Sequence, residues 1–207
     1  MYKYKSHAKV NIGLQIRDRR PDGYHNIHTI FQELEFHDLI TLNQADTGCE
    51  LTADVAWVPT DNSNICVEAY LALKARFPDL PGVRIQLEKL IPAGAGLGGG
   101  SGNGAAVLKG LNEMFALGIS LSELEQIAIP IGADVPFFIR GGTQLGEEIG
   151  DQLTILPPLS AIWFLLVVPP FRINTAWAYS QVKKHLNSQV KRINFRGFFQ
   201  GENTPWE

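Results

Sequence analysis

The sequence of 207 residues predicts an α+β fold, with strands and helices segregated along the chain more than they alternate. Two observations support this prediction. From Val10 to Ile16, apolar residues alternate with polar or small ones, which is the period-two pattern of a strand with one buried face. Further on, a glycine-rich stretch from Gly94 to Gly104 separates a segment with strand periodicity from one with helical periodicity.

The early chain is expected to be mainly β. The buried face of the first strand is expected to carry Val10, Ile12, Leu14 and Ile16. The sequence Pro21-Asp22-Gly23 then predicts a chain reversal, because proline fixes one backbone dihedral angle and glycine supplies a positive one. Residues 27–36 and 39–42 are expected to form further strands.

Capping residues indicate where the helices begin. Asn64 is expected to cap a helix that Pro78 ends, with apolar residues at roughly four-residue spacing: Ile65, Ala69, Leu73 and Phe77. Ser120 and Glu123 have the spacing of a capping box and predict another helix. Between them we expect a strand over residues 83–87 and, after the glycine-rich stretch, a helix that buries Ala106, Leu108, Leu111 and Phe115.

The last part of the chain begins with a long apolar run from Leu159 to Phe171. This run is too short to span a bilayer, so we expect a buried strand around Phe164 to Val168. A helix is expected near Ala176 to Leu186. Turn signals at Pro157-Pro158 predict a boundary between two domains, residues 1–157 and residues 158–207.

The composition excludes several classes of partner. Lys and Arg total 18 against 21 Asp and Glu, and a formal charge of −3 offers no general attraction to nucleic acid or to anionic lipid. The N-terminus lacks the apolar core of a secretory signal. Cys49 and Cys66 have neither metal-ligand spacing nor the density of a disulfide scaffold. We therefore expect a cytoplasmic protein, a monomer or homodimer, without nucleic-acid or membrane partners.

The glycine-rich stretch is the strongest local signal for chemistry. Residues without a β-carbon let a phosphate approach the backbone, and the N-terminus of the following helix supplies N–H donors. A Walker A loop is excluded, because no lysine occurs between Lys89 and Lys109. The dinucleotide pattern G-x-G-x-x-G is met, although Pro92 separates strand from loop and no clear parallel βαβ unit follows.

Four motifs in a fixed order carry a family resemblance. Pro92, Gly96, Leu97, Gly98 and Ser101 fit the phosphate loop of the GHMP kinases. The other motifs are Lys9-Val10-Asn11-Ile12-Gly13-Leu14, Arg20-Pro21-Asp22-Gly23-Tyr24-His25 and Gly132-Ala133-Asp134-Val135-Pro136-Phe137-Phe138. Together they resemble the signatures of the diphosphocytidyl-methylerythritol kinase family, and the Pro-Asp-Gly-Tyr-His segment separates this branch from mevalonate, homoserine and galactose kinases. The resemblance runs from about residue 3 to residue 207.

The resemblance implies a fold and a reaction. The GHMP kinase fold has an N-terminal α/β domain like that of ribosomal protein S5, followed by a C-terminal α+β domain. The family uses ATP and Mg²⁺ to phosphorylate the 2-hydroxyl of 4-diphosphocytidyl-2-C-methyl-D-erythritol, in the non-mevalonate route to isoprenoid precursors. The chain stops before the family's last glycine-rich segment. We therefore expect an incomplete second domain and a chain that is poorly soluble or dimerises through an exposed strand edge.

The resemblance also implies roles for the matching residues. Asp134 would be the general base, with Lys9 as its electrostatic partner at the acceptor hydroxyl. The cytidine-linked acceptor would be bound by Asn11, Tyr24, His25 and Tyr179. The nucleoside of ATP would lie towards Asn64 and Lys89, and its phosphates would be bound by Pro92, Ala93, Gly94, Ala95, Gly96, Leu97, Gly98, Gly99, Gly100, Ser101 and Gly102. The Ser101 hydroxyl would also bind Mg²⁺.

One motif departs from the family pattern. The family usually has Ser-Ser-Asp-Ala-Ala or Ser-Ser-Asn-Ala-Ala where this chain has Ser101-Gly102-Asn103-Gly104-Ala105. Gly102 is expected to remove a hydroxyl near the phosphates, and Gly104 to weaken the start of the helix. Two alternatives to an active kinase stay open. One is a degenerate relic that keeps only nucleotide binding or the fold, and the other is an NAD-dependent oxidoreductase based on the dinucleotide pattern.

Overall fold

The structure, a computed structural model, describes residues 1–159, 162–169 and 175–182. It divides into two compact units, which are described one at a time. Unit 1 comprises Met1–Lys9 and Glu33–Gly141, and unit 2 comprises Val10–Gln32 and Gly142–Glu207. The paired strands β1 (Tyr2–Arg19) and β2 (His25–Ala45) both continue from one unit into the other.

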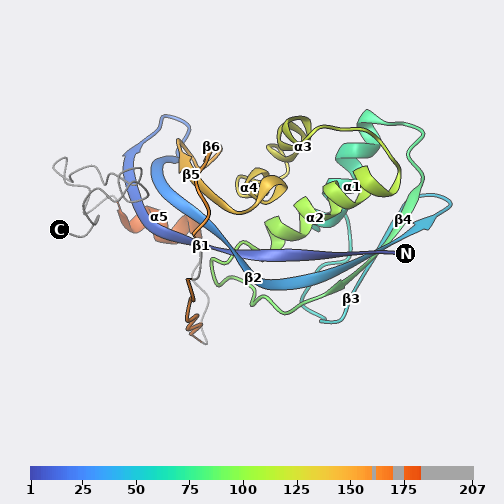
Figure 1. The fold of residues 1–207 in the computed structure, drawn as a ribbon, viewed down its shortest axis with the longest axis horizontal. Helices are drawn as coiled ribbons and strands as arrows, with labels where there is room; N and C mark the ends of the chain where they lie inside the picture. Colours follow the sequence, from blue (N-terminus) through green and yellow to red (C-terminus); the bar gives the residue numbers. More distant parts are fainter. Residues whose placement is uncertain (160–161, 170–174, 183–207) are drawn as a thin grey trace. The chain divides into compact units, whose positions relative to one another are not determined.

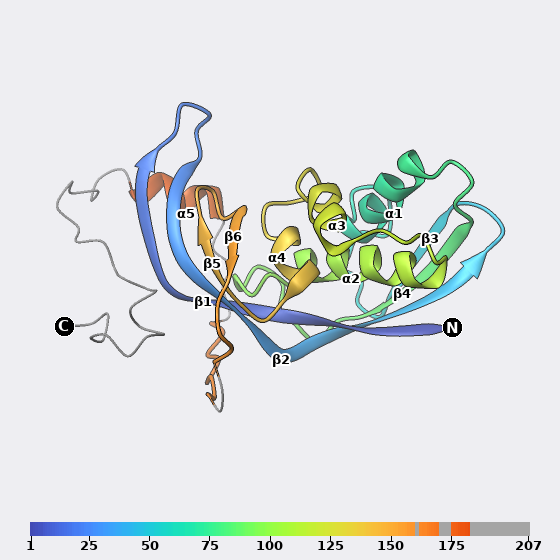
Figure 2. The same ribbon diagram turned by 45° about the horizontal axis from the view of Figure 1, so that its top comes forward.

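Unit 1 is a sheet with helices on one face (Figure 1). Strand β4 (Gly82–Glu88) pairs parallel with β3 (Cys49–Ala53) and antiparallel with the second half of β2, where Leu42 lies opposite Ile85. Figure 2 shows that one side of this sheet is covered by α1 (Ile65–Arg76), α2 (Gly99–Met114), α3 (Leu121–Ala128) and α4 (Val135–Arg140). The order is that of an α+β fold, as the sequence predicts.

The core of unit 1 lies between the sheet and helix α2. Strand β4 alternates as expected, with Val83, Ile85 and Leu87 buried. Helix α2 buries Ala106, Leu108 and Leu111, and it packs against α1 and α4. Phe115, expected in the core, is the C-cap of α2 and is only half-buried.

The predicted helix caps are confirmed. The Asn64 side chain accepts a hydrogen bond from the Cys66 N–H at 2.8 Å, which begins α1. Ser120 and Glu123 form a reciprocal capping box at the start of α3. The buried face of α1 is wider than its predicted stripe and consists of Cys66, Val67, Ala69, Tyr70 and Leu73.

Unit 2 is built on the first half of β2. Strand β5 (Thr143–Glu147) pairs antiparallel with β2, Thr29 opposite Gly146, and with β6 (Gln152–Ile155). The predicted reversal between β1 and β2 is present, since Gly23 has a φ of 92° and donates to the Arg20 carbonyl at 3.1 Å. Helix α5 (Thr175–Val182) matches the start of the helix expected at 176–186, and residues 183–186 lie outside the described residues.

Two strand predictions in β1 and β2 need correction. Residues 27–36 and 39–42 belong to one continuous strand, because the Asp38 carboxylate finds partners inside unit 1 and does not interrupt β2. On β1, Leu14 is 45% exposed whereas Gln15 is 7% exposed, so the predicted buried face is wrong there. Gly13 has a φ of 63°, which interrupts the regular pleat on which the alternation depends.

The apolar run after β6 does not form the expected buried strand. Residues 162–169 have no regular secondary structure, and Trp163 and Leu165 are 96% and 91% exposed. A strand needs a neighbour for its backbone hydrogen bonds, and apolar composition does not supply that neighbour. The domain boundary at residue 157 stays a prediction.

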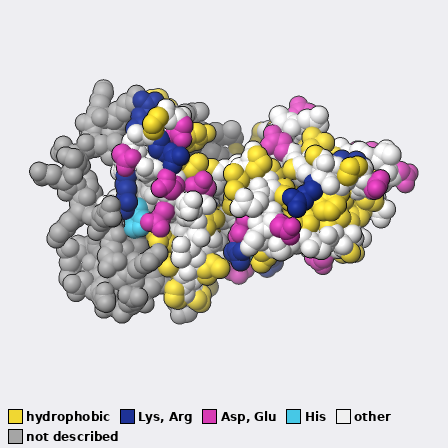
Figure 3. All heavy atoms as spheres, turned by 90° about the horizontal axis from the view of Figure 1, so that it is seen from above, with side chains coloured by type: hydrophobic (Ala, Val, Ile, Leu, Met, Phe, Trp, Pro, Cys, Tyr) yellow, Lys and Arg dark blue, Asp and Glu magenta, His cyan; other side chains and the backbone are white. Residues whose placement is uncertain are grey.

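None of the helices described is long and apolar enough to cross a membrane. On the face drawn in Figure 3, the described basic side chains are scattered among acidic, apolar and uncharged ones. That distribution agrees with the formal charge of −3.

Candidate active site

The glycine-rich loop joins β4 to α2 in unit 1. Gly94, Gly96 and Gly98 have φ values of 71°, 74° and 68°, a region that residues with a β-carbon rarely adopt. Gly98 is the N-cap of α2 and offers no side-chain cap. The first helical hydrogen bond is donated by Gly102 to the Gly98 carbonyl at 2.9 Å. The N–H groups that precede it in the first turn have no acceptor within the helix, so they are available to an anion.

The loop packs tightly on one side and is open on the other. A β-carbon at Gly98 would lie 2.8 Å from the Phe138 ring and 3.0 Å from Lys9 Cγ. Lys9 also donates its backbone N–H to the Leu97 carbonyl at 2.9 Å. At Gly100, by contrast, no described atom beyond its chain neighbours and the backbone of its own helix lies within 4 Å of the equivalent position. The end of the loop therefore rests against β1 and α4, while the first turn of α2 is accessible at Gly100.

Lys9 and Asp134 form an ion pair beside the loop. Lys9 Nζ lies 3.4 Å from Asp134 Oδ2, and the two side chains are 8% and 36% exposed. Asp134 precedes α4 but makes no side-chain capping bond to it, so its carboxylate is not used to start the helix. A carboxylate, an ammonium group and a glycine-rich backbone loop thus lie close together in unit 1, and these are the kinds of group that phosphoryl transfer to an alcohol uses.

Gly102 and Gly104 have packing roles that the sequence did not indicate. A β-carbon at Gly102 would lie 2.7 Å from the His7 carbonyl oxygen on β1. A serine there would clash with β1, which argues against the idea that Gly102 merely lacks a hydroxyl for the phosphates. A β-carbon at Gly104 would lie 3.1 Å from Ile65, so this glycine lets α2 approach α1 closely.

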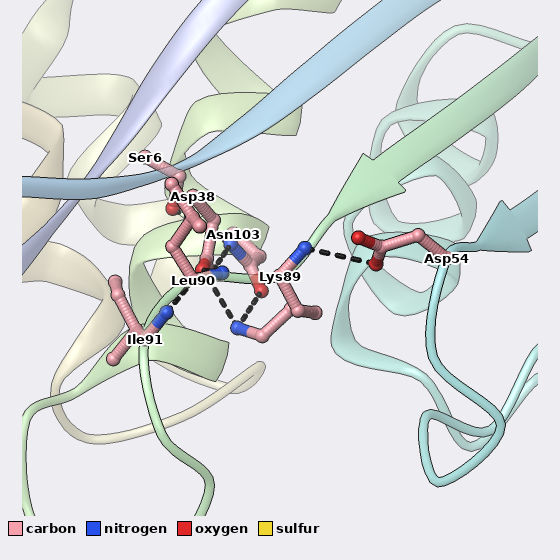
Figure 4. Close-up of polar contacts among 7 residues, drawn as sticks. All are labelled: Ser6, Asp38, Asp54, Lys89, Leu90, Ile91 and Asn103. Atoms are coloured by element: carbon pink, nitrogen blue, oxygen red, sulfur yellow. Dashed lines mark hydrogen bonds and ion pairs between the residues drawn. The ribbon is translucent and has the colours of Figure 1, made fainter.

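Asn64 and Lys89, predicted to lie towards the nucleoside, use their polar atoms within unit 1. Besides its capping bond, Asn64 donates through Nδ2 to the Pro59 carbonyl at 2.6 Å. Lys89 Nζ forms an ion pair with Asp38 and donates to Asn103 Oδ1 at 3.1 Å (Figure 4). The sequence pattern does not single out Asp38, because other charged residues, Glu33 and Glu35, stand in the same strand segment. Nucleoside contact stays a prediction for Asn64 and Lys89.

The residues predicted to bind the acceptor lie in unit 2. The rings of His25 and Tyr179 stack on each other, with centroids 5.5 Å apart and planes 27° apart. Since stacked atoms lie about 3.5 Å apart, no base fits between these two rings as they stand. His25 is 7% exposed, and its Nε2 has no hydrogen-bond partner among the described residues. Asn11 donates to Thr29 Oγ1 at 3.1 Å, and Tyr24 is 61% exposed.

The described residues contain no group of three or more His, Cys, Asp or Glu side chains suited to hold a metal. Ser101, the predicted Mg²⁺ ligand, is half-buried in the first turn of α2. Mg²⁺ is commonly held in kinases by few protein groups together with phosphate oxygens. A single hydroxyl beside the loop fits an ion that arrives with a nucleotide.

The dinucleotide interpretation of the loop requires a parallel βαβ unit. Strand β4 is followed by helices α2, α3 and α4, and the next strand, β5, pairs antiparallel with β2. No parallel strand follows α2 in the part of the chain that the structure describes. This topology argues against an NAD-dependent oxidoreductase.

Comparison with known proteins gives one consistent group. A family model for the GHMP kinases N terminal domain matches residues 64–142. The 4-diphosphocytidyl-2-C-methyl-D-erythritol kinase of Acetivibrio thermocellus is 41% identical over 179 residues, which cover 86% of this chain and 63% of that relative. The enzyme of the same name from Geobacter sulfurreducens is 40% identical over 197 residues, 95% of this chain and 70% of the relative. The chain therefore spans less than two thirds of the first relative and somewhat more of the second.

Solved structures agree with these relatives. A crystal structure of 4-(cytidine 5'-diphospho)-2C-methyl-D-erythritol kinase superposes with a TM-score of 0.75 at 29% identity, covering 99% of this chain and 74% of that one. The mevalonate kinase of Methanococcus jannaschii has a TM-score of 0.57 at 11% identity, with 75% of this chain and 56% of that one covered. The second similarity concerns the fold alone.

Proposed function

Because the chain belongs to the 4-diphosphocytidyl-2-C-methyl-D-erythritol kinase family of the GHMP kinases, we propose that it transfers the γ-phosphate of ATP to the 2-hydroxyl of 4-diphosphocytidyl-2-C-methyl-D-erythritol. The observation that carries this proposal is the Lys9–Asp134 ion pair beside the glycine-rich loop. The product would enter the non-mevalonate route to isoprenoid precursors. We expect this reaction to take place in the cytoplasm. The protein is expected to act as a monomer or a homodimer.

In the proposed reaction, Asp134 accepts the proton of the acceptor hydroxyl. The hydroxyl oxygen forms a bond to the γ-phosphorus while the bond from that phosphorus to the β-γ bridging oxygen breaks, which releases ADP. Lys9, held at 3.4 Å from Asp134, keeps the carboxylate in place and stabilises negative charge on the reacting oxygens. The protein takes little part in covalent chemistry. The rate enhancement therefore comes from the alignment of the two substrates and from the stabilisation of negative charge.

The loop from Pro92 to Gly102 is proposed to bind the phosphates of ATP. The N–H groups of Gly99, Gly100 and Ser101 belong to the first turn of α2, where the helix dipole adds partial positive charge. The Ser101 hydroxyl would contribute to Mg²⁺ binding. Bound with ATP, Mg²⁺ neutralises charge on the phosphate oxygens.

The acceptor is proposed to bind in unit 2 through its cytidine end. His25 Nε2 is buried without a partner among the described residues, which leaves a directional hydrogen-bonding group for a pyrimidine. The stacked Tyr179 ring fixes the orientation of His25. Tyr24 and Asn11 are proposed to contact the same ligand, with the base stacking on an outer ring face.

Phosphoryl transfer can be tested directly. The purified chain is incubated with Mg²⁺, γ-³²P-labelled ATP and 4-diphosphocytidyl-2-C-methyl-D-erythritol, and labelled product is quantified, with mevalonate and homoserine as control acceptors. Label in the cytidine-linked acceptor alone is expected. Stabilisation by ATP in a thermal-shift assay without labelled product would instead indicate a nucleotide-binding relic. Stabilisation by NAD and not by ATP would overturn the proposal.

A further inference from the structure

A buried polar cluster lies behind the glycine-rich loop in unit 1, and the proposed reaction does not use it directly (Figure 4). It consists of Ser6 on β1, Asp38 on β2, Lys89 after β4 and Asn103 on α2. Asp38 is 0%, Ser6 1% and Asn103 2% exposed. Burying a carboxylate costs free energy unless hydrogen-bond donors surround it. The groups that donate to Asp38 therefore indicate the role of the cluster.

Both oxygens of Asp38 are used. Oδ1 accepts hydrogen bonds from the backbone N–H groups of Leu90 and Ile91, each at 2.8 Å. Oδ2 forms the ion pair with Lys89 and accepts a hydrogen bond from Asn103 Nδ2 at 2.9 Å. The carboxylate thus meets two backbone donors, an ammonium group and an amide, which fills its capacity as an acceptor.

Asn103 connects this carboxylate to the helix. Its Nδ2 also donates to Ser6 Oγ at 2.8 Å, and its Oδ1 accepts from Lys89 Nζ at 3.1 Å. Leu90 and Ile91 stand at the beginning of the glycine-rich loop, and Asn103 stands one turn inside α2. A single carboxylate on β2 therefore binds both ends of the loop.

Holding both ends matters because the chain between them is rich in glycine. Glycine loses more conformational freedom on ordering than any other residue, so an unanchored loop of this kind would have to be ordered when the phosphates bind. A loop with fixed ends presents its N–H groups already aligned, which lowers the entropy cost of binding. Buried ion pairs contribute little net stability, so alignment accounts for the cluster better than stability does.

We propose that Asp38 is a positioning residue that clamps the two ends of the phosphate-binding loop, with Lys89 and Asn103 as the groups through which it acts. The inference rests on the proposed binding of ATP phosphates by this loop. It assigns to Lys89 a role inside the clamp, since its ammonium group bonds to Asp38 and Asn103 and its side chain is 6% exposed.

The clamp is tested with Asn103→Ala, which removes the bond to α2 and leaves the Asp38–Lys89 pair and the two backbone bonds in place. Hydrogen–deuterium exchange of peptides covering residues 90–103 is measured, together with calorimetric binding of β,γ-imido-ATP with Mg²⁺. We expect exchange in the loop to rise at least tenfold and affinity for the analogue to fall at least tenfold, with exchange in α3 unchanged. Asp38→Asn should have a larger effect in the same direction.

Asp54→Asn is the matched control. Asp54 accepts a hydrogen bond from the Lys89 backbone N–H at 3.0 Å, on the same segment, and among the described residues its carboxylate has no hydrogen bond to α2. Its substitution should leave loop exchange and analogue affinity within twofold of the wild type. If Asp38→Asn does not fold, Asn103→Ala still decides the question.

Unchanged loop exchange and unchanged affinity in folded Asn103→Ala would overturn the clamp. A uniform rise of exchange throughout unit 1 would also overturn it, because it would show that the cluster only stabilises the fold of unit 1. Both measurements are independent of phosphoryl transfer. A wild type that transfers no phosphate would therefore contradict the proposed reaction without deciding the clamp.

Discussion

The two units differ in whether their buried polar atoms have hydrogen-bond partners. In unit 1, Asp38, Lys89 and Asn103 bond to one another and to the backbone around the glycine-rich loop. In unit 2, His25 Nε2 and Asp151 Oδ1 are buried atoms without a hydrogen-bond partner among the described residues. A buried polar atom left unsatisfied costs free energy, so such atoms persist where a ligand completes them.

This difference matches the two ligands that we propose. All ATP-dependent kinases bind the phosphate groups of ATP. A loop that the protein's own hydrogen bonds already align is suited to bind them. Discrimination among acceptors needs polar groups that only the correct ligand satisfies, because a wrong ligand leaves them unpaired. Unit 1 is therefore expected to control catalysis and ATP binding, and unit 2 the choice of acceptor.

The largest effect is expected in unit 1, from Asp134→Asn. Loss of the general base should lower kcat by about 100-fold or more, because the amide cannot accept the acceptor's proton. Affinity for β,γ-imido-ATP should stay within about twofold, since the loop is unchanged. Transfer of labelled phosphate measures the first quantity and calorimetry the second. The exposed Asp46→Asn is the control, and wild-type turnover in Asp134→Asn would remove Asp134 from the mechanism.

Gly102→Ser tests the close packing behind the loop. We expect a loss of about 1–3 kcal/mol in the free energy of unfolding, because the new β-carbon would lie 2.7 Å from the His7 carbonyl oxygen. Gly100→Ala, at the open position two residues earlier, should instead gain about 0.5 kcal/mol through reduced backbone entropy. Urea unfolding measures both. Equal stability of Gly102→Ser and the wild type would restore the view that this glycine only lacks a hydroxyl.

In unit 2, His25→Ala should raise the KM for the cytidine-linked acceptor about tenfold, the value of one lost hydrogen bond. The KM for ATP should not change. Steady-state kinetics with each substrate varied in turn separates the two constants. His37→Ala, which removes a histidine from unit 1, should leave both constants unchanged. A rise in the KM for ATP alone would contradict the division of labour between the units.

Near neutral pH the smallest expected effect is that of the two buried thiols, whose loss of stability appears only in alkaline solution. Burial raises the pKa of the Cys66 thiol from 9.0 to about 12 and that of Cys49 to about 11. Folded protein thus holds these protons more tightly than unfolded protein, so the stabilisation is complete below pH 9 and is lost as the pH rises towards these values.

This alkaline loss should be confined to unit 1, which contains both cysteines. Urea unfolding between pH 8 and pH 10.5 should show a fall of about 1.4 kcal/mol per pH unit above pH 9 for each thiol. Cys66→Ala should reduce this slope. A slope unchanged by the substitution would assign the alkaline loss to other groups.

Much of unit 1 could be predicted because its signals are local. The caps at Asn64 and Ser120 and the strand from Val83 to Leu87 depend on residues a few positions apart. Lys9 and Asp134 were paired through family motifs, and the structure brings them to 3.4 Å. The role of Asp38 could not be predicted locally, because its partners lie more than fifty residues away along the chain.

The predictions that failed share one cause. The alternation from Val10 to Ile16 indicated a strand correctly, but which face is buried at Leu14 depends on the backbone at Gly13. The apolar run around Phe164 has the composition of a strand, yet residues 162–169 pair with no described strand. A hydrophobic pattern indicates which secondary structure a segment prefers. Whether the segment is buried depends on another segment that pairs with it or packs against it.

By itself, the sequence of this protein determined the order of its main elements, the place of the glycine-rich loop and the residue types available for phosphoryl transfer. Periodicity, capping and positive φ are short-range properties, so they can be read along the chain. Tertiary structure alone decided that Gly102 packs against β1, that Lys89 belongs to the Asp38 cluster and that His25 stacks on Tyr179. These facts depend on which distant segments meet, because burial and pairing are set by contacts that no local pattern contains.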